Sequence, residues 1–296
     1  MQLTETTTLF ARQMAGNGRS AHRRAAYLRD LRALSRWTGG DAALSTITPD
    51  HLSRFLISDM VLRTPAGDPR AAISVNRTKS ALRSFFAFCV ESGLIKENPA
   101  RLIRSSPARS QEPATLSDAD IPAIRNFLRD AQGSNASRDR LIFELLLGTG
   151  SRLGSLVGLN RGDVNLEACT LHITAKGGRR ERAFLNQQVC GLLRHHLGES
   201  ATQSPRGPNM PVFLSKSGCH LGARQIRLHF AWWLGQAGIT RPFSIHSLRH
   251  TFATRLYRKT GDLYLVRRAL RHRQIATTEI YTRVDDDALR RAVSAP

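Results

Sequence analysis

Residues 245–256 read IHSLRHTFATRL, which places two histidines and an arginine within five positions. The pattern of this stretch predicts a helix, and His246 and Arg249, three positions apart, share one face of it. An imidazole and a planar guanidinium on one face can donate hydrogen bonds to a single anion, a geometry that suits a phosphate. The stretch therefore predicts an anion-binding helix face.

A metal site is an alternative interpretation of the same stretch, because His246 and His250 are four positions apart and also share a face. A zinc hydrolase built on such a pair usually carries a glutamate after the first histidine, but here Ser247 follows. The cysteines are far apart in the sequence and form no C-x-x-C pair: Cys89, Cys169, Cys190 and Cys219. We therefore expect neither a metal nor another cofactor.

The charge of the chain points to a polyanion as its partner. Lysine and arginine number 44 against 23 aspartates and glutamates, which gives a formal charge of +21. So many positive side chains would repel one another if no partner neutralised them. We therefore expect the partner to be a nucleic acid, rather than the charge forming only a solvated basic surface. With 296 residues, 41% of them hydrophobic, the chain can bury a sizeable core and is expected to form two domains.

The location of the protein is expected to be cytoplasmic. No apolar run is long enough to span a bilayer, and the N-terminal stretch MQLTETTTLFARQ lacks the basic and apolar segments of a signal peptide. Few, scattered cysteines fit a reducing compartment. These patterns predict no membrane partner.

The first hundred residues have the pattern of short helices. Residues 26–37 carry apolar side chains at helical spacing, and two glycines follow them as a stop. Thr48 and Pro49 are typical of a helix start, and residues 74–93 form another amphipathic helix. Residues 105–114 are polar, contain two prolines and have no period, so we expect an inter-domain linker there.

The helix predicted for residues 74–93 has a basic side formed by Arg77, Lys79 and Arg83. A charged face in contact with solvent is one interpretation, and contact with a nucleic-acid backbone is the other. Arg179 and Arg180, further along the chain, are candidates for the same kind of contact.

The second half of the chain combines helices with one hairpin. Ser117 and Asp120 have the spacing of a capping box, and residues 142–150 run as a mostly buried helix into a glycine turn. Residues 169–185 alternate around a pair of glycines, which predicts a β-hairpin with Lys176 at the end of its first strand. Helical patterns return at residues 225–238 and 263–272.

Three residues of this half could take part in chemistry. Lys176 stands out because lysine is scarce here and, unlike the arginines Arg179 and Arg180 beyond it, can give up a proton as an acid. Tyr281 could be a nucleophile if positive groups or a proton acceptor activated its phenol. His272 lies nine residues before it. Taken singly, an exposed turn lysine, a packing tyrosine and a capping histidine are the simpler interpretations.

Four segments occur in this order along the chain: GTGSRLGSLVGL, AKGGRRER, HSLRHTFAT and LRHRQIATTEIYTR. Taken together, they resemble the tyrosine recombinases, also called phage-type integrases. The resemblance extends over nearly the whole chain. It implies a mainly α fold with a small β-sheet: a helical, SAM-like core-binding domain for DNA at residues 1–104 and a catalytic domain at residues 115–296.

The resemblance also implies a role for each matched residue. Arg152 and Arg249 would hold the non-bridging oxygens of the scissile phosphate beside His246, and His272 would bond the same phosphate. Lys176 would protonate the departing 5′-oxygen, and Tyr281 would attack to form a 3′-phosphotyrosine. His250 falls outside this set and is expected to be a packing or hydrogen-bonding residue.

Three positions depart from the pattern of the resembled family. Gly154 and Ser155 replace a frequent Ser-Glu pair, which removes a carboxylate near the first arginine. Arg271 replaces a common glycine and would be strained if its backbone were left-handed, and Phe184 replaces a frequent proline after the hairpin.

Two rival functions fit much of the same pattern: a non-catalytic DNA-binding protein on this scaffold, and a relaxing topoisomerase with the same chemistry. A metallohydrolase is a third. The resemblance further implies a homo-tetramer on two DNA duplexes, in which residues 284–296 would dock onto a neighbouring subunit.

Overall fold

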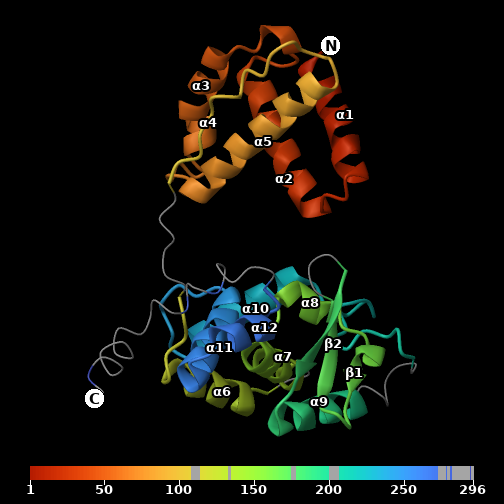
Figure 1. Ribbon diagram of the computed structural model, residues 1–296. Helices are drawn as coiled ribbons and strands as arrows, with labels where there is room; N and C mark the ends of the chain where they lie inside the picture. Colours follow the sequence, from red (N-terminus) through yellow and green to blue (C-terminus); the bar gives the residue numbers. More distant parts are fainter. Residues whose placement is uncertain are drawn as a thin grey trace. The chain divides into compact units, whose positions relative to one another are not determined.

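The computed structural model describes residues 1–107, 114–132, 135–174, 178–199 and 207–272, together with positions 278, 281 and 294. The chain divides into two compact units, unit 1 (Met1–Ser110) and unit 2 (Gln111–Pro296). Helices dominate both units, and unit 2 also contains a small antiparallel sheet (Figure 1). The predicted fold class, mainly α with a small sheet, is confirmed.

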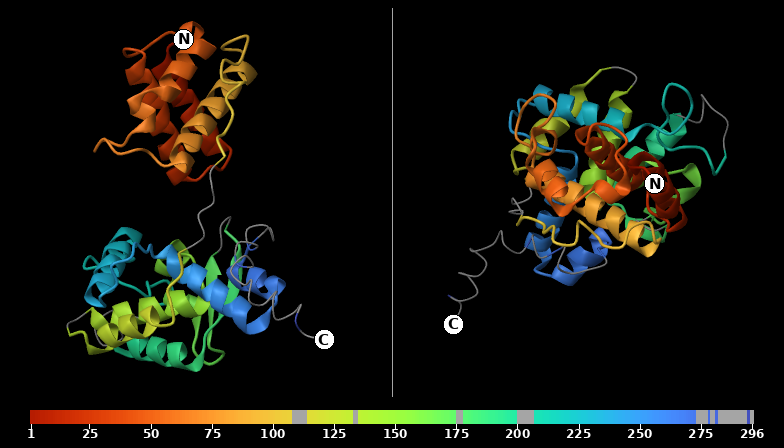
Figure 2. Two further views of the ribbon diagram at one scale, coloured as in Figure 1. Left: turned by 90° about the vertical axis from the view of Figure 1, so that its left-hand side faces the viewer. Right: turned by 90° about the horizontal axis from the view of Figure 1, so that it is seen from above.

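Unit 1 is a helical bundle (Figures 1 and 2). Its helices are α1 (Leu3–Gly16), α2 (Ala21–Trp37), α3 (Pro49–Ile57), α4 (Asp59–Leu62) and α5 (Ala72–Glu91), with a 3-10 turn at Leu44–Thr46. The side chain of Thr48 caps α3 by accepting a hydrogen bond from the backbone N–H of His51, as the sequence predicts. Phe85 of α5 is fully buried and packs edge-on against Phe10 of α1, with ring centroids 5.6 Å apart. The amphipathic faces of these helices therefore form one core.

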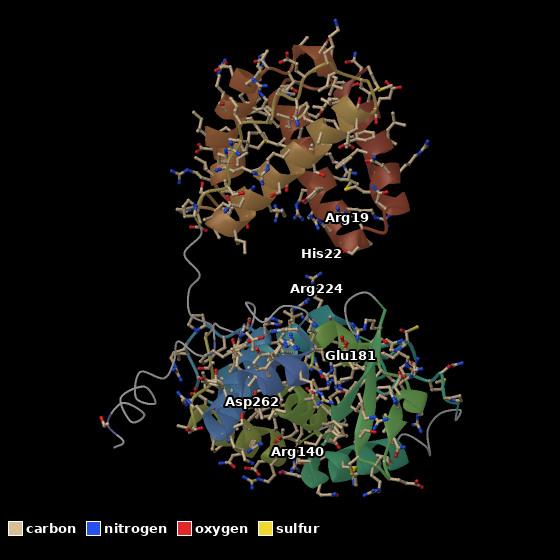
Figure 3. The ribbon with its side chains drawn as sticks, viewed as in Figure 1. Arg19, His22, Arg140, Glu181, Arg224 and Asp262 are labelled. Carbon is tan, nitrogen blue, oxygen red and sulfur yellow. A yellow bond between two sulfur atoms is a disulfide. The ribbon has the colours of Figure 1, made fainter. Side chains whose placement is uncertain are left out.

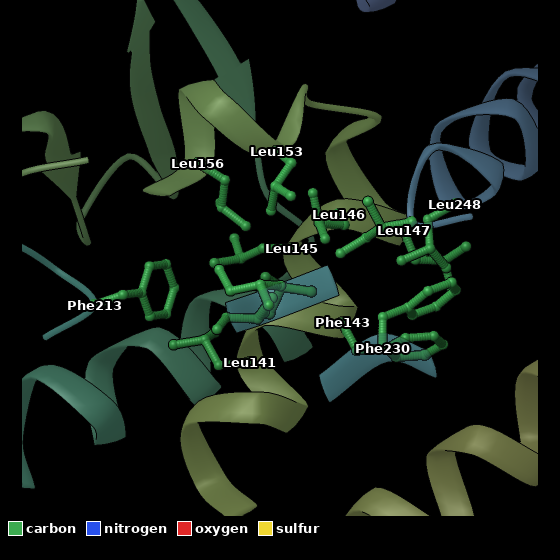
Figure 4. Close-up of a cluster of buried hydrophobic side chains, with 14 of the residues drawn as sticks. Leu141, Phe143, Leu145, Leu146, Leu147, Leu153, Leu156, Phe213, Phe230 and Leu248 are labelled. Atoms are coloured by element: carbon green, nitrogen blue, oxygen red, sulfur yellow. The ribbon is translucent and has the colours of Figure 1, made fainter. Parts of the chain in front are cut away.

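In unit 2, the other elements pack around a central helix, α7. Its helices are α6 (Asp120–Asp130), α7 (Ala136–Thr149), α8 (Leu153–Val157), α9 (Gln187–Glu199), α10 (Ala223–Gln236), α11 (His246–Thr260) and α12 (Leu263–Leu270), with a 3-10 turn at Arg161–Asp163. The apolar run in α7 is buried, because α8 and α11 cover it with Leu153 and Leu248, among others (Figure 4). Ser117 and Asp120 exchange hydrogen bonds as a capping box at the start of α6.

The sheet has the order β1 (Val164–Asn165), β2 (Thr170–Thr174) and β3 (Arg180–Phe184), all antiparallel. Leu171 pairs with Ala183, and both are buried, so the alternation of apolar residues sets this register. The predicted hairpin is confirmed. Strand β1 and helices α8 and α9 were not among the predicted elements; β1 and α8 are too short to show a period of apolar residues.

Cys169 and Cys190 form a disulfide that joins the start of β2 to α9, whereas Cys89 and Cys219 are free. The sequence did not predict this pair, since its partners are 21 residues apart and meet only through the fold. Within the part of the chain that the structure describes, no helix is long and apolar enough to cross a membrane.

Candidate active site

Arg249 is the most buried cation of the candidate site, with 3% of its surface exposed. It lies in the first turn of α11, and its guanidinium donates to the carbonyl oxygens of Gly150 and Leu270. These bonds join the first turn of α11 to the ends of α7 and α12. Because a guanidinium has five N–H donors, further donors remain for an anion.

Gly150 is needed where α7 meets this arginine. Its φ angle of +58° is left-handed, and a Cβ atom there would come within 2.3 Å of the Phe252 ring. The turn after Gly150 leads directly to Arg152, which is the N-cap residue of α8. Gly150 thus links the two predicted arginines: its carbonyl accepts a hydrogen bond from Arg249, and Arg152 follows it two positions later in the chain.

The positive charges of Arg152 and Arg249 lower the pKa values of the neighbouring histidines. Burial first, and then the charges of Arg249 and Arg152, lower the pKa of His246. The same causes lower the pKa of His272 to about 4. Burial, followed by the charge of Arg152, lowers the pKa of Arg249 to about 10. The four groups are therefore close enough to interact: Arg249 is buried, Arg152 and His272 are partly exposed and His246 is exposed, and their combined charge favours a bound anion.

Tyr281 lies beside this cluster. Its ring is 2% exposed and packs with Val266 and Leu270 of α12. Burial raises the pKa of its phenol, while the charges of Arg249 and Arg152 act in the opposite direction. His272 Nδ1 lies 2.9 Å from Thr278 Oγ1, three positions before this tyrosine. The structure therefore brings together five of the six residues predicted to be catalytic.

Lys176 is the sixth, and it lies outside the residues that the structure describes. The strands on either side of it are described, and Ser155 of α8 donates a hydrogen bond of 2.8 Å to the Thr174 carbonyl at the end of β2. Ser155, at one of the departing positions, therefore fixes α8 to the strand that leads to Lys176.

Sequence reasoning missed the contact of His250. Its Nδ1 atom lies 2.8 Å from Tyr281 Oη, and the centroids of the two rings are 5.7 Å apart. The expectation of a hydrogen-bonding residue is met, but its partner is the predicted nucleophile. The i, i+4 spacing from His246 was the available signal, and it pointed only to a metal.

Arg271 has the left-handed backbone expected of the glycine that it replaces, with φ 57° and ψ 42°. Its side chain is 7% exposed, and its Nε atom lies 3.8 Å from a carboxylate oxygen of Glu181 on β3, a residue labelled in Figure 3. This Nε atom has no hydrogen-bond partner among the described residues. Arg271 thus adds a further buried cation near the site, and Glu181 supplies a carboxylate that the sequence did not predict. Phe184 is 71% exposed.

The residues predicted to contact a nucleic acid form hydrogen bonds or ion pairs with other residues of the protein. Arg77 forms a two-pronged ion pair with Asp30 of α2, at 2.9 and 3.0 Å, and the Asp30 side chain is only 4% exposed. Lys79 bonds the Ser106 hydroxyl at 2.8 Å, and Arg83 bonds the Ile103 carbonyl at 3.0 Å. Arg77 therefore joins α5 to α2, whereas Lys79 and Arg83 hold the segment after α5 against that helix.

The two arginines beyond the hairpin turn also have acidic partners. Arg180 is paired with Asp163, and Arg179 lies 4.0 Å from Glu181. All five predicted contacts therefore have partners within the protein.

A different basic face lies on α2. Arg29, Arg32 and Arg36 are exposed, lie at helical spacing on one face, and have no polar partner among the residues that the structure describes. Arg19 and His22 add positive and titratable groups near the start of the same helix (Figure 3).

Metal ligands do not gather in the described parts of the chain: no group of three or more His, Cys, Asp and Glu side chains could hold an ion there. His246 and His250 pack ring edge to ring face, with centroids 5.2 Å apart.

Comparison with known proteins identifies both units. Residues 114–288 match the phage integrase family, and residues 9–93 match the phage integrase N-terminal SAM-like domain. The chain is 34% identical to tyrosine recombinase XerD of Lacticaseibacillus casei over 227 residues, which cover 75% of this chain and 76% of that protein. It is 30% identical to tyrosine recombinase XerC of Neisseria meningitidis over 282 residues, covering 93% and 89% of the two chains.

Solved structures have the same fold. The XerH recombinase bound to its palindromic difH substrate superposes with a TM-score of 0.74 at 22% identity, covering 92% of this chain and 79% of that one. A lambda integrase dimer bound to a COC′ core site gives a TM-score of 0.71 at 20% identity, covering 94% and 97%. Together with the matches in sequence, these similarities show that the chain belongs to the phage integrase family of tyrosine recombinases.

Proposed function

We propose that this protein is a site-specific DNA recombinase that cuts and rejoins DNA through a 3′-phosphotyrosine formed on Tyr281. The observation that carries the proposal is the position of the Tyr281 phenol within the charge field of Arg152 and Arg249, of which Arg249 is buried. A phosphodiester held by those cations would present its phosphorus to the phenol oxygen.

The chemistry requires stabilisation of the negative charge that develops on a five-coordinate phosphorus. Arg152 and Arg249 are proposed to hold the non-bridging oxygens, with His246 and His272 donating further hydrogen bonds. Fixed cationic donors in a half-buried site perform this task without reorganising at the moment of reaction. In this scheme the protein bonds that fix the Arg249 guanidinium serve catalysis.

Bond exchange is balanced at every step. Tyr281 Oη gives up its proton to a base and forms a bond to phosphorus while the bond from phosphorus to the 5′-oxygen breaks, and Lys176 is proposed to protonate that oxygen. The free 5′-hydroxyl of a partner strand then reverses the step. No water or nucleotide is consumed, because the phosphodiester energy is retained in the covalent intermediate.

The two domains have separate proposed roles. Residues 1–104 would bind double-stranded DNA, and residues 115–296 would hold the scissile phosphate, with residues 105–114 as the linker between them. For the first domain, the exposed arginines of α2 are better candidates for phosphate contacts than Arg77, whose guanidinium is paired with Asp30. A homo-tetramer on two duplexes would complete the exchange. Residues 284–296, proposed to dock onto a neighbour, include only one described position.

The experiment that tests this function offers the protein nicked duplexes, drawn from the DNA that flanks its own gene, in the presence of EDTA. A recombinase gives a protein–DNA adduct on a denaturing gel and, with intact sites, exchanges strands between two labelled duplexes. Binding without any adduct would favour the non-catalytic scaffold. Relaxation of supercoils without strand exchange would favour a topoisomerase, and loss of activity in EDTA would favour a metallohydrolase.

A further inference from the structure

His250 is placed to handle the proton of the Tyr281 phenol. Its Nδ1 atom lies 2.8 Å from Tyr281 Oη, within normal hydrogen-bond distance. Among the described residues, His250 is the only hydrogen-bond partner of the phenol oxygen. The ring of His250 also packs edge to face with the ring of His246, with centroids 5.2 Å apart.

The surroundings keep His250 neutral. Burial, followed by the nearby His246 and Arg249, lowers the pKa of His250 to about 4. The other titratable groups of the cluster are Arg152, Arg271, His272 and Tyr281. A neutral imidazole with its proton on Nε2 has a free lone pair on Nδ1, and that lone pair can accept the phenol proton.

Tyr281 needs such an acceptor. Burial raises the pKa of its phenol, so the phenolate is scarce at neutral pH. The neighbouring arginines cannot accept a proton. Nδ1 of His272 is engaged with the Thr278 hydroxyl, and no contact between His246 and the phenol is present in the described residues. Geometry therefore singles out His250.

We propose that His250 is the general base that takes the Tyr281 proton during DNA cleavage and returns it during rejoining. This inference rests on the proposed function. As the Oη–H bond breaks and an Nδ1–H bond forms, Oη bonds to phosphorus and the bond to the 5′-oxygen breaks. The charge of the bound phosphate offsets the repulsion of the imidazolium by Arg249. In rejoining, the imidazolium protonates the departing phenolate.

The test measures single-turnover adduct formation on a nicked duplex for the wild type, His250→Asn and His250→Ala. Asparagine can hydrogen-bond from nearly the Nδ1 position but cannot accept the proton, so it separates positioning from base catalysis. We expect both variants to bind DNA normally and to cleave about 10²–10⁴-fold more slowly. His220→Asn, an exposed histidine outside the site, is the matched control and should cleave like the wild type.

Two substitutions in the reacting groups locate the defect on the nucleophile side. A 5′-bridging phosphorothiolate makes the leaving group independent of an acid, and it should not restore cleavage by His250→Ala. Replacing Tyr281 with 3-fluorotyrosine lowers the pKa of the phenol, and it should restore part of that rate. The rate of His250→Ala should also rise about tenfold for each pH unit while hydroxide substitutes for the base.

The inference would be overturned if His250→Asn cleaved within about threefold of the wild type, because positioning alone would then suffice. It would also be overturned if the phosphorothiolate restored His250→Ala fully. If the wild type itself formed no adduct on any flanking DNA, the proposed function would fail first, and that outcome is distinguishable from a defect confined to the His250 variants.

Discussion

Arg249 Nη2 donates a hydrogen bond of 2.6 Å to the carbonyl oxygen of Leu270, at the end of α12. With the bond to Gly150, this contact fixes the plane of a guanidinium in the first turn of α11. The arrangement explains why lysine should not replace this arginine: an ammonium is a point charge and cannot match the two carbonyls and an anion in one plane.

Arg249→Lys is therefore expected to lose both stability and activity. Leaving a buried carbonyl without its donor costs about 1–3 kcal/mol of the free energy of unfolding. Adduct formation should fall by at least about 10²-fold, as for the loss of an oxyanion donor. Urea unfolding and the suicide-substrate assay measure the two effects. Arg255→Lys, an exposed change on the same helix, is the control, and equal behaviour of the two variants would contradict the account.

Stability should depend on pH through the histidines of the site. His250 and His272 have folded-state pKa values of about 4, below the ordinary value of 6.5, so between these limits the unfolded chain binds more protons. Lowering the pH from about 6.5 to about 4 should therefore destabilise unit 2, and above 6.5 their contribution is fully present. Urea unfolding between pH 7.5 and 4.5 measures the slope. His250→Asn should reduce it; an unchanged slope would contradict the assignment.

The left-handed backbone of Arg271 predicts a reversal in the usual order of alanine and glycine. Arg271→Gly and Arg271→Ala both remove the side chain, so their difference isolates the backbone. Glycine should be more stable by about 1–2 kcal/mol. At Arg267, inside α12, alanine should instead be more stable by about 1 kcal/mol. Thermal unfolding of the four variants gives both differences, and the same order at both positions would refute the backbone assignment.

Arg77 is expected to stabilise the folded state of unit 1 rather than to contact DNA. Arg77→Ala leaves the Asp30 carboxylate buried without its partner, which should destabilise unit 1 by about 1–3 kcal/mol after allowance for the partly exposed arginine. The double variant Arg77→Met with Asp30→Leu should recover most of this loss. Chemical denaturation measures it. A stable Arg77→Ala with weakened DNA binding would instead support the contact with the nucleic-acid backbone.

The exposed arginines of α2 are expected to contribute to DNA binding and not to stability. Arg29→Ala and Arg32→Ala should leave the free energy of unfolding unchanged, since neither side chain has a partner in the described part of the chain. Each should reduce the slope of log affinity against log salt concentration by about 1 if it contacts a phosphate. Binding titrations at several salt concentrations decide this. Slopes equal to that of the wild type would exclude α2 from the interface.

Local patterns were sufficient to predict much of the fold. The apolar run of α7, the capping of α3 and α6, and the alternation in β2 and β3 each depend on residues a few positions apart. Likewise the shared face of His246 and Arg249 follows from helical spacing alone. These elements were predicted because their physics is contained in a short segment.

The remaining features depend on contacts between distant segments. His250 meets Tyr281 across 31 positions, and Arg77 meets Asp30 across 47. A polar residue that satisfies a buried partner looks the same in sequence as one that faces solvent, so the basic side of α5 was ambiguous. The carboxylate of Glu181 was missed for the same reason, since only the hairpin brings it to Arg271.

The most direct measurement of the central claim is mass spectrometry of the adduct after digestion with trypsin and nuclease. The account predicts a peptide in which Tyr281 carries a nucleotide through a 3′-phosphate, formed in EDTA and absent from Tyr281→Phe. A nucleotide attached to another residue, or an equal yield of adduct from Tyr281→Phe, would contradict it.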